Sequence, residues 1–431
     1  MIRRMTIQEI HQFFLSSSGV TSDTRNLTKG GMFFALKGAN FNGNSFAAKA
    51  LEAGCAFAVV DEFQESEDSR IIHVENVLNT LQDLAHFHRM QFDIPIIGIT
   101  GSNGKTTSKE LTGVVLSKKF KTLVTAGNLN NHLGVPFTLL KLTKEHELAI
   151  IEMGANKPGD IKELVEIAAP THGIITNIGA AHIEGFGSIE GVIKTKGEMY
   201  DFISAHEGTV FYHAADPILS AILPQNVPCY SFGDSEADVD GQLVAQNPFI
   251  SFKWNTKTYF SPVLETHLVG RYNFTNFLLA VSVGNYFGVD PADINEAIQT
   301  YLPTNNRSQI TKTERNTLIV DCYNANATSM KAALESLLEM EGDEKVLILG
   351  DMKELGAISM EEHQKIVDFI EFNKLRAFLV GEEMCKVAGD IPHFDSWKEL
   401  VQNEDFVKLK KSLILIKGSR GIRLEEILSY L

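Results

Sequence analysis

The stretch Ile94-Pro95-Ile96-Ile97-Gly98-Ile99-Thr100-Gly101-Ser102-Asn103-Gly104-Lys105-Thr106-Thr107 joins an isoleucine-rich run to a glycine loop and a Lys-Thr pair. The apolar run predicts a buried strand, and the helical spacing from Lys109 to Leu116 predicts a helix after the loop. Strand, glycine loop, Lys-Thr and helix follow one another in the order of a phosphate-binding loop. The standard motif has a glycine where this chain has Ile99, so an ordinary strand-turn-helix connection is the alternative.

The residue types of this loop suit a nucleotide phosphate. Gly101 and Gly104 allow backbone N–H groups to point inward. The ammonium of Lys105 can reach terminal phosphates, the hydroxyl of Thr106 can bind Mg²⁺, and the start of the helix adds its own positive end. We therefore predict a phosphate site formed by Gly101, Ser102, Asn103, Gly104, Lys105, Thr106 and Thr107.

Composition limits the class of protein. The 431 residues suggest two to four domains, and 44% hydrophobic with 22% charged residues is typical of a soluble globular chain. A net charge of −15 argues against non-specific nucleic-acid binding. The four cysteines are far apart and give no zinc or disulfide framework. No apolar segment approaches the length of a membrane span, so we expect a cytoplasmic protein.

The order of apolar runs predicts an α/β fold with three domains. Residues 1–88 read as a small α/β unit, with strands and a helix in alternation. Residues 89–301 contain repeated strand–loop–helix patterns around the phosphate loop, which indicate a mostly parallel sheet covered on both faces. Residues 302–431 restart the pattern as a second doubly wound, Rossmann-like unit. The segment 301–306 is the expected hinge.

Two polar residues follow buried strands of the central domain. Glu152 ends the apolar run Leu148–Ile151, and His182 comes shortly after the run Gly173–Ile178. In parallel sheets ligands lie outside the carboxyl ends of the strands, so both side chains can converge on the phosphate loop. A carboxylate at that place is a natural Mg²⁺ ligand. The alternatives are a strand-end turn residue for Glu152 and a structural histidine for His182.

The first domain contains two polar segments with two open interpretations. One is Ser22-Asp23-Thr24-Arg25, and the other is the segment 37–44, which follows a strand directly. Their Asn and Gly content is equally typical of surface turns and of a binding loop. A third polar loop, 127–136, precedes a short helix in the central domain and includes Asn128.

Taken together, these motifs resemble the Mur ligases, ATP-dependent enzymes that add amino acids to peptidoglycan precursors. The resemblance covers all three expected domains, and the family's phosphate loop also lacks the standard glycine. The residues that carry it are 22–25, 100–107, 127–136, 152–156, 176–187, Lys196-Gly197-Glu198, 321–326, 350–356 and Lys417-Gly418-Ser419.

The resemblance implies roles for particular residues. It implies ATP and two Mg²⁺ in the central domain, with Lys105, His182 and Lys196 as catalytic residues and Thr106, Glu152, His182 and Lys196 at the metals. Lys196 is the position of a carbamylated lysine in the family, although a solvated helix lysine is the alternative. ATP contacts beyond the phosphate loop are expected from Asn273, Arg307, Asp321, Tyr323, Asn324 and Asn326. Contacts to the UDP-linked substrate are expected from Ser22, Asp23, Thr24, Arg25, Lys37, Asn44 and Asn128.

Within the family, the stretch Gly350-Asp351-Met352-Lys353-Glu354-Leu355-Gly356 favours the branch that adds D-Ala-D-Ala to UDP-MurNAc-tripeptide through an acyl phosphate. We expect those two small molecules as partners, no nucleic acid, no membrane span and a monomer. A ligase that adds the third residue of the peptide, or a folylpolyglutamate synthase, is the nearest alternative. From another class, a P-loop nucleotide switch would leave the first and third domains unexplained.

Overall fold

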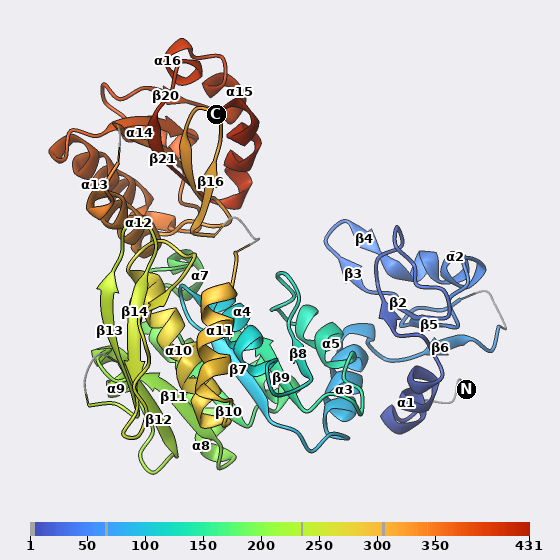
Figure 1. The fold of residues 1–431 in the computed structure, drawn as a ribbon. Helices are drawn as coiled ribbons and strands as arrows, with labels where there is room; N and C mark the ends of the chain where they lie inside the picture. Colours follow the sequence, from blue (N-terminus) through green and yellow to red (C-terminus); the bar gives the residue numbers. More distant parts are fainter. Residues whose placement is uncertain (1–4, 65–67, 234–235, 304–306, 343) are drawn as a thin grey trace.

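The computed structural model describes residues 5–64, 68–233, 236–303, 307–342 and 344–431. Three main sheets, of four, nine and six strands, follow one another along the chain. Figure 1 shows two outer parts that each meet the central part and lie apart from one another. The predicted α/β architecture with mostly parallel sheets is confirmed. The predicted boundaries after residues 88 and 301 fall between the sheets and stay predictions, and residues 304–306 of the expected hinge lie outside the described residues.

The first domain is built on a parallel sheet of order β1-β2-β5-β6. Its strands are β1 (Val20–Thr21), β2 (Met32–Phe34), β5 (Phe57–Val60) and β6 (Ile71–His73). The remaining elements are α1 (Ile7–Leu15), the hairpin β3 (Lys37–Gly38) and β4 (Phe41–Asn42), the 3₁₀ turn η1 (Gly43–Phe46), and α2 (Ala47–Glu52). Because the strands are parallel, the polar segments that follow β1, β2 and β5 leave the sheet at the same edge.

Helix α3 (Val77–Arg89) connects the first domain to the second and packs against both. Its buried Leu84 belongs to one apolar cluster with Phe34 of the first domain and with Leu139 and Leu164 of the central helices. His88 on the same helix bonds His11 of α1 at 3.0 Å and the carbonyl of Leu142 at 3.0 Å. The first two domains therefore share a continuous core.

The central sheet has the order β15-β14-β13-β12-β11-β10-β7-β9-β8. Its parallel strands are β7 (Ile96–Thr100), β8 (Thr122–Val124), β9 (Leu148–Glu152), β10 (His172–Ile175), β11 (Thr209–His213) and β12 (Cys229–Gly233). Its helices are α4 (Lys105–Leu116), α5 (Gly134–Leu139), α6 (Asp160–Ala168), α7 (Ile183–Phe186), α8 (Ile189–Ala205), α9 (Pro217–Ala221), α10 (Tyr272–Tyr286) and α11 (Pro291–Thr300).

Helices cover this sheet on both faces. Ile96 and Ile151 pack into the core shared with the first domain, whereas Ile97 and Ile150 pack into a second core with α4 and α10. Side chains alternate between faces along a strand, so a strand covered on both sides must be apolar throughout. This explains the continuous isoleucine runs that the sequence shows.

The far edge of the central sheet differs from the parallel pattern. Strand β13 (Val239–Ala245) still pairs parallel with β12, whereas β14 (Ser251–Asn255) pairs antiparallel with both β13 and β15 (Leu264–Glu265). These strands are only partly buried, which leaves polar residues such as Asp240 and Gln242 inside the seven-residue strand β13. Half-exposed strands of this kind lack long apolar runs, so their sequences do not predict them.

The third domain has a six-stranded sheet of order β16-β17-β21-β18-β19-β20, parallel except for β16. Its strands are β16 (Gln309–Lys312), β17 (Thr317–Asp321), β18 (Glu344–Gly350), β19 (Arg376–Val380), β20 (His393–Phe394) and β21 (Ser412–Lys417). Its helices are α12 (Ala327–Glu339), α13 (Ser359–Phe372), α14 (Glu382–Val387), α15 (Trp397–Leu400) and α16 (Glu404–Val407), with 3₁₀ turns η2 (Gly356–Ile358), η3 (Arg420–Ile422) and η4 (Leu424–Tyr430). Among the described residues, no helix has the length and apolar character needed to cross a bilayer.

Candidate active site

A cavity of about 1100 Å³ lies between the carboxyl ends of central strands and the third domain. Lys105, Glu152 and His182 all line it, although they are far apart in the chain. The other predicted site residues in its wall are Ser102, Asn103, Gly104, Thr106, Thr107, Asn128, Asn273, Arg307, Asp321, Tyr323, Asn324 and Asn326. The expectation that three strand ends converge on one place therefore agrees with the structure.

Strand register places these residues together. Strand β7 lies between β9 and β10, with Ile99 opposite Glu152 and Thr100 opposite Ile175. The loop that follows β7 is therefore flanked by Glu152 on one side and by the segment after β10 on the other. From that second side, Asn177 accepts a hydrogen bond from the backbone N–H of Asn103 at 3.0 Å and donates one to its carbonyl at 3.0 Å.

Two glycines are required by the shape of the loop. Gly101 has φ +146°, and a Cβ there would lie 1.9 Å from the hydroxyl oxygen of Thr176. Gly104 has φ +78° and immediately precedes α4, and a Cβ there would lie 2.6 Å from the amide oxygen of Asn276. Both positions need glycine for backbone conformation and for space. The loop ends at the N-terminus of a twelve-residue helix, which favours bound anions.

Lys105 is held against the loop that it follows. Its ammonium donates to the carbonyls of Gly101 at 2.7 Å and Ser102 at 3.2 Å. Burial lowers the pKa of Lys105 to about 8, and the positive charge of Arg307 acts in the same direction, whereas Glu152 opposes it. A phosphate in the cavity would supply the negative charge that this buried ammonium favours.

Glu152 is the most constrained carboxylate of the cavity. Its Oε1 accepts hydrogen bonds from the Thr106 hydroxyl at 3.1 Å and from the Asn130 amide at 2.8 Å. Its Oε2 lies 3.2 Å from the ammonium of Lys109, and the Lys109 and Glu152 side chains are 2% and 1% exposed. Every partner comes from an element that borders the phosphate loop or the 127–136 loop.

The Thr106–Glu152 pair fits a divalent cation. Adjacent oxygens around Mg²⁺ at 2.0–2.1 Å in octahedral geometry are about 3 Å apart, and the two protein oxygens here are 3.1 Å apart. The third predicted ligand, His182, lines the same cavity, and its Nδ1 is bonded to Glu354 of the third domain. Metal-binding histidines commonly give their second ring nitrogen to a carboxylate in this way. No cluster of three or more His, Cys, Asp or Glu side chains suited to a metal exists among the described residues.

Lys196 lies on α8 behind the cavity wall. Its side chain is buried, with the ammonium 5.7 Å from the centre of the Phe186 ring. Burial, reinforced by the positive charge of Lys105, holds the pKa of Lys196 well below its ordinary value. A solvated helix lysine, the alternative from sequence, is excluded by this burial. Only the neutral form of a lysine amine reacts with CO₂, and a lowered pKa favours that form.

The third domain contributes the opposite wall. Asp321, at the end of β17, pairs with the buried Lys417 at 2.6 Å and accepts from the Ser308 N–H at 3.3 Å. The guanidinium of Arg307 stacks on the Tyr323 ring at 3.9 Å. Flat stacked groups and a fixed carboxylate suit a nucleoside, whose base presents a ring face and whose ribose presents hydroxyls.

Direct bonds join the third domain to the phosphate loop. Asn326, which caps α12, donates to the side-chain oxygen of Asn103 at 2.8 Å. The carbonyl of Glu354 accepts from the N–H of Glu184 at 3.3 Å. The third domain therefore touches both the loop and the segment that carries His182.

Comparison with known proteins agrees with this arrangement. Family models match residues 16–89 (Mur ligase family, catalytic domain), 99–284 (Mur ligase middle domain) and 306–420 (Mur ligase, glutamate ligase domain). The chain belongs to the Mur ligase family. The resemblance seen in the sequence is thus confirmed.

Relatives of this Mur ligase extend over nearly its full length. It is 35% identical to the UDP-N-acetylmuramoyl-tripeptide–D-alanyl-D-alanine ligase of Bacillus subtilis over 95% of this chain and 92% of the relative. MurF from Acinetobacter baumannii has a similar structure, with TM-score 0.87 and 30% identity over 99% of this chain and 98% of that one. MurF from Thermotoga maritima, solved in complex with ADP, gives TM-score 0.86 and 26% identity over 97% of both chains.

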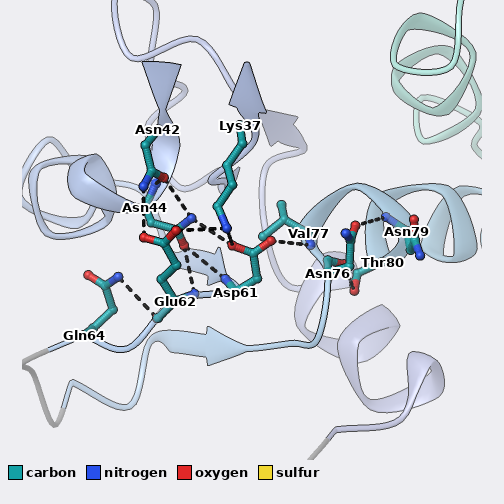
Figure 2. Close-up of polar contacts among 10 residues, drawn as sticks. All are labelled: Lys37, Asn42, Asn44, Asp61, Glu62, Gln64, Asn76, Val77, Asn79 and Thr80. Carbon is teal, nitrogen blue, oxygen red and sulfur yellow. Dashed lines mark hydrogen bonds and ion pairs between the residues drawn. The ribbon is translucent and has the colours of Figure 1, made fainter. Parts of the chain in front are cut away.

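The predicted substrate residues of the first domain do not line the cavity of this Mur ligase. Asp23 and Arg25 form an exposed ion pair with each other. Lys37 pairs with Asp61 and Glu62, each at 2.9 Å, and the buried Asn44 lies next to them (Figure 2). The Asn44 amide donates to Asp61 at 2.9 Å and accepts from the Asp61 N–H at 3.0 Å. Asn44 therefore holds this turn in place in the present arrangement.

Several residues of the Mur ligase site were not singled out from sequence. Lys109 and Asn130 hold Glu152, Asn177 holds the phosphate loop, and Lys417 holds Asp321. Asn130, Asn177 and Lys417 do lie in stretches that the sequence analysis quoted. Lys109 follows Lys105 by four residues, so helical spacing puts both on the same face of α4, which was the available indication.

Proposed function

We propose that this chain is an ATP-dependent ligase that joins D-alanyl-D-alanine to UDP-MurNAc-tripeptide in peptidoglycan precursor synthesis. The observation that carries the proposal is the match to ligases of that name over 95% of the chain, at 35% identity. The cavity that unites a phosphate loop with third-domain residues supports it. A P-loop switch would leave this third-domain wall without a role.

ATP is the expected occupant of the cavity. The phosphate loop from Gly101 to Thr107 suits the phosphates, with the ammonium of Lys105 as the nearest cation. Asn273 lines the same cavity, as do Arg307, Asp321 and Tyr323 at the third-domain wall. These residues are the candidates for the adenine and ribose, and Asn324 and Asn326 complete the third-domain side.

Thr106 and Glu152 are the residues that would hold one Mg²⁺, and His182 and carbamylated Lys196 are the candidates for a second. A bound Mg²⁺ supplies positive charge to the transferring phosphoryl group. Carbamylation would convert the buried Lys196 amine into an anion, which suits a divalent cation and removes the cost of a buried ammonium. Glu354 engages Nδ1 of His182, so Nε2 is the ring nitrogen that would bind the metal.

The chemistry has two balanced steps. The terminal carboxylate of the tripeptide attacks the γ-phosphorus of ATP, so an acyl phosphate forms and ADP leaves. The amine of D-alanyl-D-alanine then attacks the acyl carbon, inorganic phosphate leaves, and the nitrogen loses a proton. Lys105 stabilises negative charge on the transferring group, and one fixed donor of this kind is typically worth about 3 kcal/mol. Contact between the third domain and the loop excludes water from the acyl phosphate.

The first domain is the candidate site for the UDP end of the substrate. The polar residues that follow β1 and β2 lie at the carboxyl edge of the sheet, where parallel sheets bind ligands. They are Ser22, Asp23, Thr24, Arg25 and Lys37. Asn44 supports the Lys37 side of that edge, and Asn128 lines the cavity described above. We place the reaction in the cytoplasm, where ATP and UDP-linked precursors are available, and expect a monomer by gel filtration.

Nucleotide turnover tests this proposal. ADP release by the purified protein with ATP and Mg²⁺ should require UDP-MurNAc-tripeptide and D-alanyl-D-alanine together. Equal release with either substrate omitted contradicts the ligase assignment. A panel of UDP-linked tripeptides with different third residues would then define which peptide is accepted. Mass spectrometry of the product should show the tripeptide extended by one dipeptide.

A further inference from the structure

Lys109 is a buried cation that the mechanism above does not use. It lies one helical turn beyond Lys105 on α4, and its side chain is 2% exposed. Its ammonium lies 3.2 Å from Oε2 of Glu152 and 3.4 Å from the carbonyl of Gly127. Whereas Lys105 lines the cavity, Lys109 approaches Glu152 from the interior of the protein.

The two oxygens of Glu152 therefore have different surroundings. Oε1 is shared by the Thr106 hydroxyl and the Asn130 amide, which both belong to the cavity wall. Oε2 has no neutral hydrogen-bond donor among the described residues and faces the Lys109 ammonium. A cation that enters the cavity meets Oε1 beside Thr106, and it is repelled from Oε2 by the lysine.

We propose that Lys109 is a positioning residue that makes Glu152 a single-oxygen ligand and thereby favours Mg²⁺ over Ca²⁺ at this site. The inference rests on the proposed Thr106–Glu152 metal site. Mg²⁺ is small, takes octahedral geometry and binds carboxylates through one oxygen, whereas Ca²⁺ accepts six to eight oxygens and often takes both oxygens of a carboxylate. Because Lys109 occupies the second oxygen of Glu152, the carboxylate cannot bind Ca²⁺ through both of its oxygens.

Simple packing does not account for a lysine at this place. A buried ion pair is often no more stable than apolar side chains of similar volume, because both charges must be desolvated. The surrounding core on this face of the sheet is apolar, with Leu111 and Ile150 among its members. An ion pair directed at one oxygen of a candidate metal ligand gives that carboxylate a fixed orientation, which packing alone would not provide.

Cation competition tests the inference without measuring turnover. Mn²⁺ bound to the full-length protein with ADP is followed by electron paramagnetic resonance, and Mg²⁺ or Ca²⁺ is added to displace it, with ADP alone as the baseline. In Lys109→Met the Ca²⁺-to-Mg²⁺ affinity ratio should rise about tenfold, since partners that orient a metal ligand typically change metal affinity by about 10- to 100-fold. A general loosening of the site would weaken both ions equally and leave the ratio unchanged.

Matched variants complete the design. Lys118→Met removes the same charge from the surface pair that Lys118 forms with Glu296 at 3.1 Å, and it should leave the ratio unaltered. If Lys109→Met does not fold by circular dichroism, Lys109→Gln replaces it, and the ratio should shift in the same direction because a neutral amide repels no cation. An unchanged ratio in the folded variant overturns the role of Lys109. Absence of protein-dependent Mn²⁺ binding in the unmodified chain would instead overturn the proposed metal site.

Discussion

Two lysine–carboxylate clusters follow parallel strands in this protein, and they differ in their contact with water. Lys109 and Glu152 are 2% and 1% exposed in the central domain. In the first domain Lys37 and Glu62 are each 45% exposed, and Asp61 is 10% exposed. The same residue types at the same topological position thus form a fixed buried pair in one domain and a hydrated surface cluster in the other.

This difference indicates how each cluster can be used. A buried charge that loses its partner cannot be hydrated, so the central pair has one stable arrangement. Exposed ion pairs contribute little to stability because water and salt screen them, so the Lys37 cluster can exchange its partners for a ligand at low cost. The proposed reaction centre is therefore preformed, whereas the proposed UDP-binding surface of the first domain can rearrange.

The largest effect is expected at Lys105. Lys105→Ala should lower the rate of ADP release about a thousandfold, since a fixed donor to developing charge is worth about 10²- to 10³-fold. Steady-state kinetics with both peptide substrates measure it. Lys144→Ala, at an exposed position, is the control. A rate within tenfold of the unmodified enzyme would argue that Lys105 does not contact the transferring phosphate.

Removing one carboxylate from each cluster tests the comparison directly. Glu152→Gln should destabilise the protein by about 3 kcal/mol, because it leaves the buried Lys109 without its counter-charge. Glu62→Gln should leave the free energy of unfolding unchanged, since water replaces the lost ion pair. Urea unfolding of the two variants measures both effects. Equal loss of stability in the two would remove the distinction drawn here.

Stability should fall in acid because of a partly buried histidine of the central sheet. Burial lowers the pKa of His172 from 6.5 to about 4. The unfolded chain therefore binds a proton that the folded chain does not, so this contribution is present above pH 6.5 and is lost as the pH falls toward 4. The loss by pH 4 is about 3 kcal/mol. Urea unfolding of His172→Gln between pH 7 and pH 4 should show a correspondingly shallower decline.

The smallest effect is expected at the surface cluster. Lys37→Met should raise the KM for UDP-MurNAc-tripeptide about tenfold, the equivalent of one charged hydrogen bond. The KM for ATP and the melting temperature should stay as they are, because Lys37 lies outside the nucleotide cavity. Lys49→Met, on the neighbouring helix α2, is the matched control. If both Michaelis constants rise together, Lys37 acts on the fold and not on the substrate.

Much of the fold could be predicted because buried parallel strands leave continuous apolar runs. The run Leu148–Ile151, which Glu152 ends, became β9 with the bounds Leu148–Glu152. The antiparallel strands β13 to β15 were missed because partial exposure lets polar residues into them. The predicted ends of short elements were less accurate. The run Gly173–Ile178 was expected to be a strand, but the observed strand β10 ends at Ile175.

The candidate site was predictable where function needs an unusual residue pattern. The glycine loop and Glu152 stand out because few other roles explain them at a strand end. Lys109 and the Asn326–Asn103 bond were not predictable, because a lysine in a helix and an asparagine before one are ordinary in any sequence. Only the packing of α4 against the sheet and of the third domain against the loop reveals them.

The helix that joins the first two domains has a consequence for experiments on fragments. The apolar side of α3 packs against both domains. Separating the domains would therefore expose apolar side chains of α3 to water and destabilise each piece. A piece cut after residue 88 would expose Leu81, Leu84 and Ala85, and it should aggregate. The first domain is thus best studied attached to its neighbour, and compounds that loosen α3 would disturb both proposed substrate sites at once.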